Sequence, residues 1–114
     1  MPVRSLNSSV FKWVDKEEVL KAVKKWVSEL KKDPNVLRIG IFGSLAEGRW
    51  GVGSDVDLVI VVKESSRPFW QRSLDFERVH LPVSVDIMVY TEGEWEEVRK
   101  RKFGKLVEEK GIWL

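Results

Sequence analysis

The sequence has no cysteine and a single histidine among its 114 residues. The absence of cysteine excludes disulfide bonds, thiolate zinc sites and cysteine nucleophiles, and one histidine is too few for a histidine-rich metal site. No apolar run approaches the roughly 20 residues of a membrane-spanning helix. The segment from Met1 to Val14 lacks the charged start, long apolar block and cleavage site of a signal peptide. We therefore expect a cytoplasmic protein that does not associate with membranes.

The charge balance gives no sign of a nucleic-acid-binding surface. The 20 basic and 18 acidic side chains give a formal net charge of +2. Such a balance predicts a well-solvated surface and does not favour direct binding of nucleic acid. The hydrophobic share of 43% and the length fit one domain, spanning residues 1–114, with a core of its own. Nothing in the composition excludes a homo-oligomer.

Periodic patterns predict alternating helices and strands. Asp15, with Glu18 three residues later, resembles the capping box that begins a helix, and the apolar residues that follow have helical spacing as far as Leu30. The segment 33–35 ends this helix, and residues 1–14 form an irregular N-terminal segment. The further elements predicted are strands over Val36–Phe42, Asp57–Val62 and Val83–Tyr90, and helices starting at Ser44 and over Pro68–His80 and Glu92–Lys110.

The order of these elements predicts an α/β fold in which a small mixed β-sheet is flanked by about four helices. The residues from Leu58 to Val62 are all apolar, which is typical of a central strand covered on both faces. We therefore expect a single α/β domain whose middle strand is fully buried.

Gly43 and Ser44 stand where the first predicted strand ends and a helix is expected to begin. Glycine permits a close approach of the backbone, and the free N–H groups at a helix start favour an anion such as phosphate. The Ser44 hydroxyl can donate one more hydrogen bond. The alternative is that Ser44 is only a helix cap after a tight turn, because serine is a preferred residue at that position.

Asp55 and Asp57 lie at the start of the second predicted strand. Residues i and i+2 of a strand point to the same face, so the two carboxylates would lie side by side. Such a pair repels unless a cation lies between its members, although a surface turn can also hold it in water. The apolar run directly after Asp57 places the pair at the rim of a buried strand, where hard oxygen ligands suit Mg²⁺.

Asp86 lies inside the third predicted strand, which is otherwise strongly apolar. A charge there is costly unless it is paired or bound to a metal. The alternative is that Ser84, Asp86 and Met88 form the solvent-facing side of an edge strand. If the third strand lies beside the second, Asp86 joins Asp55 and Asp57. Three carboxylates can hold two divalent ions, which clamp an in-line phosphoryl displacement.

The combined pattern is Gly43-Ser44, the ten residues 45–54, Asp55-x-Asp57 and the distal strand residue Asp86. It resembles the DNA polymerase β-type nucleotidyltransferase superfamily. The length and layout are similar to those of the stand-alone minimal nucleotidyltransferase (MNT) proteins within it. The resemblance extends from the first helix to about Tyr90, and it implies a single nucleotidyltransferase-like domain.

The resemblance implies a role for each residue of the pattern. Asp55, Asp57 and Asp86 would be the catalytic residues and would bind two Mg²⁺ ions bridged by a nucleoside triphosphate. Asp86 would also help to deprotonate the attacking hydroxyl. Gly43 and Ser44 would hold the β- and γ-phosphates, with ATP as the substrate and pyrophosphate as the leaving product.

The sequence departs from the family at one position of this segment. Many relatives have a basic residue where Glu47 stands. Arg49 is near enough in sequence to replace it, so Arg49 is the third residue expected to bind the nucleotide. The departure leaves the three carboxylates unaffected.

In this family the MNT proteins often act with a helical HEPN-domain protein. Several such pairs resemble toxin–antitoxin systems in which AMP is transferred to the HEPN ribonuclease. The resemblance therefore implies an enzyme that transfers AMP from ATP to a HEPN-domain partner. An alternative, motivated by Glu47, is a non-catalytic antitoxin subunit that inhibits its partner by direct contact. A third hypothesis is a small-molecule nucleotidyltransferase, but that class normally needs additional helical structure.

Several other residues have more than one interpretation. Trp50 would stack on a base or a partner, or pack on its own domain. The basic run Arg99–Lys102 forms a solvated helix face, or touches an acidic partner or RNA. His80 is expected to act at a helix C-terminus rather than in catalysis. Three basic residues that follow the second strand are candidates for reaching the triphosphate, namely Lys63, Arg67 and Arg72.

Overall fold

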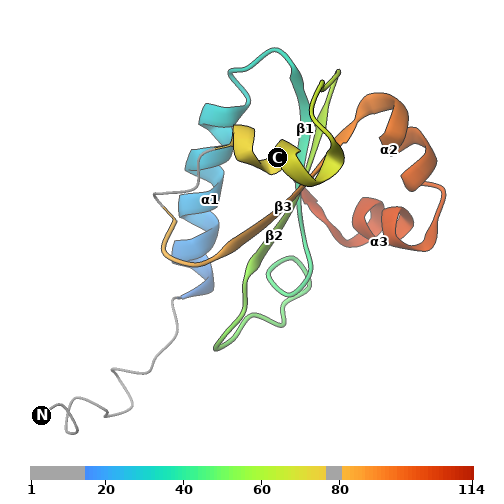
Figure 1. The fold of residues 1–114 in the computed structure, drawn as a ribbon. Helices are drawn as coiled ribbons and strands as arrows, with labels where there is room; N and C mark the ends of the chain where they lie inside the picture. Colours follow the sequence, from blue (N-terminus) through green and yellow to red (C-terminus); the bar gives the residue numbers. More distant parts are fainter. Residues whose placement is uncertain (1–14, 77–80) are drawn as a thin grey trace, which may run out of the picture.

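The structure, a computed structural model, describes residues 15–76 and 81–114. Its elements are α1 (Lys16–Leu30), β1 (Val36–Phe42), β2 (Val56–Val62), the 3₁₀ helix η2 (Phe69–Asp75), β3 (Val85–Thr91), α2 (Glu92–Val98), α3 (Lys102–Lys110) and β4 (Ile112–Trp113) (Figure 1). The bounds of α1, β1 and β2 agree with the predicted ones to within one residue. Among these elements, no helix combines the length and the apolar character needed to cross a membrane.

The four strands form one mixed sheet in the order β3-β2-β1-β4. Strands β2 and β3 run parallel, whereas β1 is antiparallel to both β2 and β4. The antiparallel pairing sets Phe42, at the end of β1, beside Asp57, at the start of β2. The segment 43–55 that joins these strands therefore lies at the end of the sheet where β2 begins (Figure 1). The predicted α/β fold with a small mixed sheet and flanking helices is confirmed.

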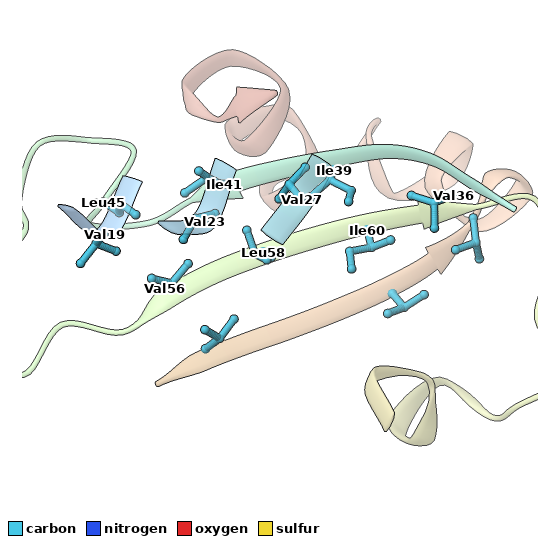
Figure 2. Packing of buried hydrophobic residues seen from close by; sticks show 13 residues of the cluster. Val19, Val23, Val27, Val36, Ile39, Ile41, Leu45, Val56, Leu58 and Ile60 are labelled. Atoms are coloured by element: carbon cyan, nitrogen blue, oxygen red, sulfur yellow. The ribbon is translucent and has the colours of Figure 1, made fainter. Parts of the chain in front are cut away.

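Strand β2 is covered on both faces, as predicted. On one face the sheet packs against α1 (Figure 2), and the buried side chains of this layer include Val19, Val23, Val56, Leu58 and Ile60. The layer on the opposite face has as its buried members Val59, Val61, Trp95 and Val107. A fully buried aliphatic side chain contributes about 1.5–3 kcal/mol. Because β2 supplies side chains to both layers, it joins the two halves of the core.

The capping box forms at α2 and not at α1. Asp15 is the residue before α1, as predicted, but its side chain makes no capping hydrogen bond, so the capping box expected for Asp15 and Glu18 is wrong. At the start of α2, the Glu94 N–H donates to Thr91 Oγ1 (3.2 Å) and the Thr91 N–H donates to Glu94 Oε1 (2.8 Å). Because Thr91 is also the last residue of β3, this box fixes the direction in which the chain leaves the sheet.

The single helix predicted over Glu92–Lys110 is wrong, because the chain breaks into α2 and α3 at residues 99–101. The physical reason lies in Gly104, where a Cβ would collide with the Val98 carbonyl oxygen. The missing side chain lets the start of α3 pack directly against the end of α2. This close approach produces a helical corner that helical periodicity does not reveal.

Strand β4 has no counterpart among the predicted elements. Its residues Ile112 and Trp113 pair with Ile41 and Gly40 of β1. Gly40 has no side chain, so the Trp113 ring can lie on the sheet at this point; a Cβ on Gly40 would be 2.8 Å from the ring. The pairing therefore depends on a glycine far away in the sequence.

The helix predicted to start at Ser44 is also wrong, because the segment forms hydrogen-bonded turns. The Glu47 N–H donates to the Gly43 carbonyl (3.0 Å) and the Arg49 N–H donates to the Ser44 carbonyl (2.9 Å). The second bond is wider than the i to i−4 bond of an α-helix. Gly48 has φ +77°, a conformation that cannot continue a right-handed helix.

The helix predicted over Pro68–His80 is a 3₁₀ helix over Phe69–Asp75. The residues 77–80, including His80, lie outside the described part of the chain. Leu74 is 67% exposed, whereas Arg72 is buried. Arg72 turns inward and donates to the Val89 carbonyl at the edge of β3. Polar contacts of Arg72 therefore help to hold this segment against β3.

A polar cluster ties α3 and β4 to the sheet. Arg38 of β1 donates two hydrogen bonds to Glu108 (2.9 and 3.0 Å), and its guanidinium lies 3.8 Å from the centroid of the Trp113 ring. Glu108 also accepts a hydrogen bond from Trp95 Nε1 (2.8 Å). The bonds from Arg38 are the main reason that the pKa of Glu108 lies below its ordinary value, and burial opposes them.

The helical corner gives a prediction for stability. Gly104→Ala should lower the free energy of unfolding by about 1–3 kcal/mol or more, because the neighbouring atoms belong to the backbone and cannot move aside cheaply. The control is Gly93→Ala in α2, where an added Cβ meets nothing within 4 Å. This control should be neutral or stabilising by up to about 1 kcal/mol. Urea denaturation measures both, and a Gly104→Ala variant as stable as the wild type would contradict the corner.

The polar cluster gives a prediction for pH dependence. Glu108→Gln should lower the free energy of unfolding at pH 7 by about 1–2 kcal/mol, because a hydrogen-bonded charge is lost. The pKa of Glu108 in the folded state lies below its ordinary value of 4.5. Its stabilising contribution is therefore present above about pH 4.5 and disappears as the pH falls through the folded-state pKa.

Urea denaturation between pH 7 and pH 3 measures this effect, and the difference between Glu108→Gln and the wild type should shrink as the pH falls. The control is Glu97→Gln, which removes an exposed carboxylate from α2. This variant should differ from the wild type by less than about 0.5 kcal/mol at each pH. A pH-independent loss in Glu108→Gln would show that the charge is not the stabilising feature.

Candidate functional site

The three predicted carboxylates lie at the end of the sheet where β2 and β3 begin. Asp57 and Asp86 are partners in the register of these parallel strands, so their side chains leave the same face of the sheet next to each other. Asp55 lies immediately before β2 and is exposed, as is Asp86, while Asp57 is half-buried. The predicted placement of Asp86 beside Asp57 is confirmed. Strand β3 is also an edge strand of the sheet, as the alternative interpretation assumed.

The carboxylates interact strongly enough to perturb Asp57. Burial raises the pKa of Asp57 above its ordinary value, and the negative charges of Asp86 and Asp55 raise it further. All three causes disfavour the charged form. A cation placed among the three carboxylates would therefore relieve the repulsion and restore the charged state.

Gly43 brings the turn after β1 against Asp57. Its φ of +73° lies in the region that favours glycine, and a Cβ at this position would collide with Asp57 Oδ2. Ser44 follows directly, and the bond from the Glu47 N–H to the Gly43 carbonyl holds the backbone of the turn. The structure thus brings the Gly-Ser pair and the carboxylates to the same end of the sheet.

Arg49 lies beside Glu47, its neighbour in the turn after β1. Arg49 Nη2 lies 3.5 Å from Glu47 Oε2, and the two side chains are 66% and 24% exposed. This separation is long for a charge-assisted hydrogen bond, so the pair restrains Arg49 only weakly. Arg49 therefore belongs to the turn that carries Gly43 and Ser44, but Glu47 offsets part of its charge.

The other candidates for contact with a triphosphate lie at the opposite end of the sheet. Lys63, Arg67 and Arg72 all follow the end of β2, whereas the carboxylates lie at its start. Arg72 is buried and forms an ion pair with Glu94, and Arg67 forms one with Asp75 (2.7 Å). The structure does not bring these three residues to the carboxylates.

Two further features of the sequence have a structural explanation. Trp50 packs against the core layer under α1, which favours packing on its own domain over stacking on a ligand. The basic run Arg99–Lys102 lies in the corner between α2 and α3 instead of along one helix face. Its first two members, Arg99 and Lys100, form exposed ion pairs within this region.

An aromatic wall borders the carboxylates, and the sequence patterns did not reveal it. Phe42 is the partner of Asp57 in the β1–β2 register and so shares its face of the sheet. The ring of Phe103, from α3, meets the Phe42 ring edge-on at a centroid distance of 5.4 Å. The position of Phe42 directly before the Gly-Ser pair is a local signal. The contact with Phe103 arises only in the tertiary structure.

The donor chemistry fits Mg²⁺ held jointly with a substrate. Residues 15–76 and 81–114 contain no group of three or more His, Cys, Asp or Glu side chains already arranged as a metal cage. Mg²⁺ does not need one, because it keeps several waters and uses one or two carboxylates together with substrate phosphates. The oxygen donors available for it are those of Asp55, Asp57 and Asp86, and the mutual repulsion at Asp57 favours a cation there.

The chain is similar to nucleotidyltransferases in sequence and in fold. The model of the nucleotidyltransferase domain family matches residues 20–112. No curated protein gives a significant match. A crystal structure from Sulfolobus solfataricus, whose description provisionally names a nucleotidyltransferase, has 27% sequence identity and a TM-score of 0.61 over 86% of this chain and 80% of that chain. Because the family match spans most of the chain, including the Gly-Ser pair and all three carboxylates, the chain belongs to the nucleotidyltransferase domain family.

Proposed function

We propose that this nucleotidyltransferase domain transfers AMP from ATP to a protein partner with the help of Mg²⁺. The observation that carries the proposal is the pairing of Asp57 with Asp86 beside the turn at Gly43. The arrangement combines oxygen ligands for a divalent cation with a backbone turn that phosphates can approach closely. Transfer of a nucleotide requires the oxygen ligands and the phosphate-binding turn at one site.

The residues of the site have distinct parts in the reaction. Asp55, Asp57 and Asp86 would hold Mg²⁺, which when bound would supply positive charge beside the phosphates of the nucleotide. The backbone at Gly43 and the Ser44 hydroxyl bind the β- and γ-phosphates, and Arg49 adds a positive charge from the same turn.

The chemistry is a substitution at the α-phosphorus of ATP. The acceptor hydroxyl oxygen forms a bond to this phosphorus, and its proton passes to the carboxylate of Asp86, which acts as the general base. The bond between the α-phosphorus and the bridging oxygen breaks, and pyrophosphate leaves. Asp86 suits this role because it is the exposed member of the paired carboxylates and can meet an incoming acceptor.

The acceptor is a HEPN-domain protein in this proposal, with the pair acting as antitoxin and toxin. This identity rests on the resemblance to the MNT proteins. It is supported by the exposure of Asp55 and Asp86, which leaves the site open to a bulky acceptor. An acceptor as large as a protein domain could not enter a closed pocket.

A second candidate function is inhibition of the partner by contact alone. The observation in its favour is the ion pair between Glu47 and Arg49, which offsets the positive charge nearest to the Gly-Ser pair. A site with less positive charge binds a triphosphate more weakly. In this case the domain would neutralise its partner without transferring a nucleotide.

The metal role of Asp57 gives a prediction for thermal stability. Asp57→Asn should melt at a higher temperature than the wild type in EDTA. The neutral amide removes both causes that raise the pKa of Asp57, which are the burial of its charge and the repulsion from Asp86 and Asp55. Mg²⁺ with a non-hydrolysable ATP analogue should raise the melting temperature of the wild type by several degrees, because a ligand stabilises the state that binds it. The variant should show a much smaller increase, measured by differential scanning fluorimetry.

The matched control for this experiment is Glu64→Gln, which removes one negative charge just after the opposite end of β2. Glu64→Gln should respond to Mg²⁺ and the nucleotide analogue as the wild type does. An Asp57→Asn variant that gains as much thermal stability from the ligand as the wild type would contradict metal binding by Asp57.

The transfer reaction gives a direct prediction of activity. With ATP labelled at the α-phosphate, Mg²⁺ and the protein product of the neighbouring gene as the candidate partner, the wild type should label the partner. Asp57→Asn and Asp86→Asn should each reduce the rate about a hundredfold or more, because charge stabilisation at the reacting phosphate is lost. The label is followed by gel electrophoresis, with Glu64→Gln as the active control.

The same variants distinguish transfer from contact. If Asp57→Asn and Asp86→Asn bind the partner but no longer neutralise it, neutralisation requires catalysis. If both variants neutralise the partner as well as the wild type does, contact is sufficient and the AMP-transfer proposal fails. A wild-type protein that binds the partner and transfers no label would lead to the same conclusion.

A further inference from the structure

An aromatic contact joins the start of α3 to the strand end that neighbours the carboxylates. Phe42, Asp57 and Asp86 form a row across one face of the sheet, since Phe42 pairs with Asp57 and Asp57 pairs with Asp86. Neighbouring strands are about 4.8 Å apart, so this row is short. Phe103, the second residue of α3, contacts the Phe42 end of the row. The first turn of α3 therefore borders the candidate site.

Two cations precede Phe103 directly. Arg101 and Lys102 are exposed, and neither forms an ion pair with any residue of the described ranges. The preceding basic residues differ in this respect, because Arg99 pairs with Glu96 (3.1 Å) and Lys100 pairs with Glu97 (3.3 Å). The two cations that precede Phe103 in the chain are thus available to a ligand.

The charge balance of the site favours their use. Three carboxylates and a triphosphate together carry more negative charge than two divalent cations neutralise. The turn at Gly43 offers one cation, Arg49, whose charge is partly offset by Glu47. Positive charge from a neighbouring element would reduce the remaining excess. Lysine has a flexible four-carbon stem, and arginine presents a fork that matches phosphate oxygens. Both side chains are therefore suited to reach a phosphate group from a neighbouring element.

We propose that Arg101 and Lys102 form a second phosphate-binding wall of the nucleotide site, facing the β- and γ-phosphates across from the Gly43-Ser44 turn. This proposal rests on the proposed function, because it assumes that a triphosphate occupies the site. It assigns a specificity role to the α2–α3 corner: the corner selects triphosphates over monophosphates. The break at residues 99–101 thereby acquires a function, since a continuous helix would carry these cations elsewhere.

The experiment measures binding by isothermal titration calorimetry, with Mg²⁺ and a non-hydrolysable ATP analogue as one ligand and AMP as the other. Lys102→Gln should weaken binding of the ATP analogue about tenfold, the effect of one charge-assisted hydrogen bond, and Arg101→Gln should act in the same direction. Binding of AMP, which lacks the β- and γ-phosphates, should change less than about twofold for either variant. Lys102→Arg should retain most of the affinity because it keeps the charge.

The control is Lys24→Gln, an equal loss of charge on the exposed side of α1 against the opposite face of the sheet. Its affinity for the ATP analogue should equal that of the wild type, and melting curves should show all variants folded. If the wild type binds the analogue and Lys102→Gln binds it equally well, the second wall is overturned while the proposed function stands. An equal loss in Lys24→Gln would also overturn the wall. If the wild type binds no ATP analogue at all, the proposed function itself fails.

Discussion

Parallel pairing of β2 with β3 holds the carboxylates of Asp57 and Asp86 side by side, and the core fixes this register. A shift of one residue would turn Leu58 and Ile60 away from the layer under α1. Burial of these two side chains contributes about 3–6 kcal/mol. Two charges about 5 Å apart near a protein surface repel by about 3 kcal/mol. Hydrophobic burial therefore outweighs the repulsion, and the folded state retains a cluster of like charges at the end of its sheet.

The helical layer on the same face determines how far this cluster is exposed. Val59 and Val61 lie under α2 and α3, whereas Asp57, two residues earlier on β2, lies where the cover ends at Phe42 and Phe103. The position of α3 in turn depends on the close contact of Gly104 with the end of α2. A glycine that touches none of the carboxylates thus sets the boundary between the covered core and the open site.

The features predicted correctly from the sequence depend on local patterns. The strands at Val36–Phe42 and after Asp57 are short apolar runs. The second run led to the prediction that Asp55 and Asp57 lie at the start of a buried strand. The features that were missed depend on distant partners. The break between α2 and α3 follows from a backbone contact of Gly104, and β4 forms because the Trp113 ring can lie over Gly40. In both cases the absence of a side chain matters, and a glycine in a sequence does not show what will pack against it.

The electrostatics of the site also restrict the form in which a nucleotide can enter. Asp57 already experiences the charges of Asp86 and Asp55, so a bare triphosphate would add further repulsion. A divalent cation reverses the sign of this interaction, because it attracts the carboxylates and the phosphates together. At the turn, Gly43 leaves free the space beside Asp57 that a Cβ would otherwise occupy. Under the proposed function, the nucleotide should therefore bind as its metal complex, with the cation on the carboxylate side and the phosphates on the side of the turn.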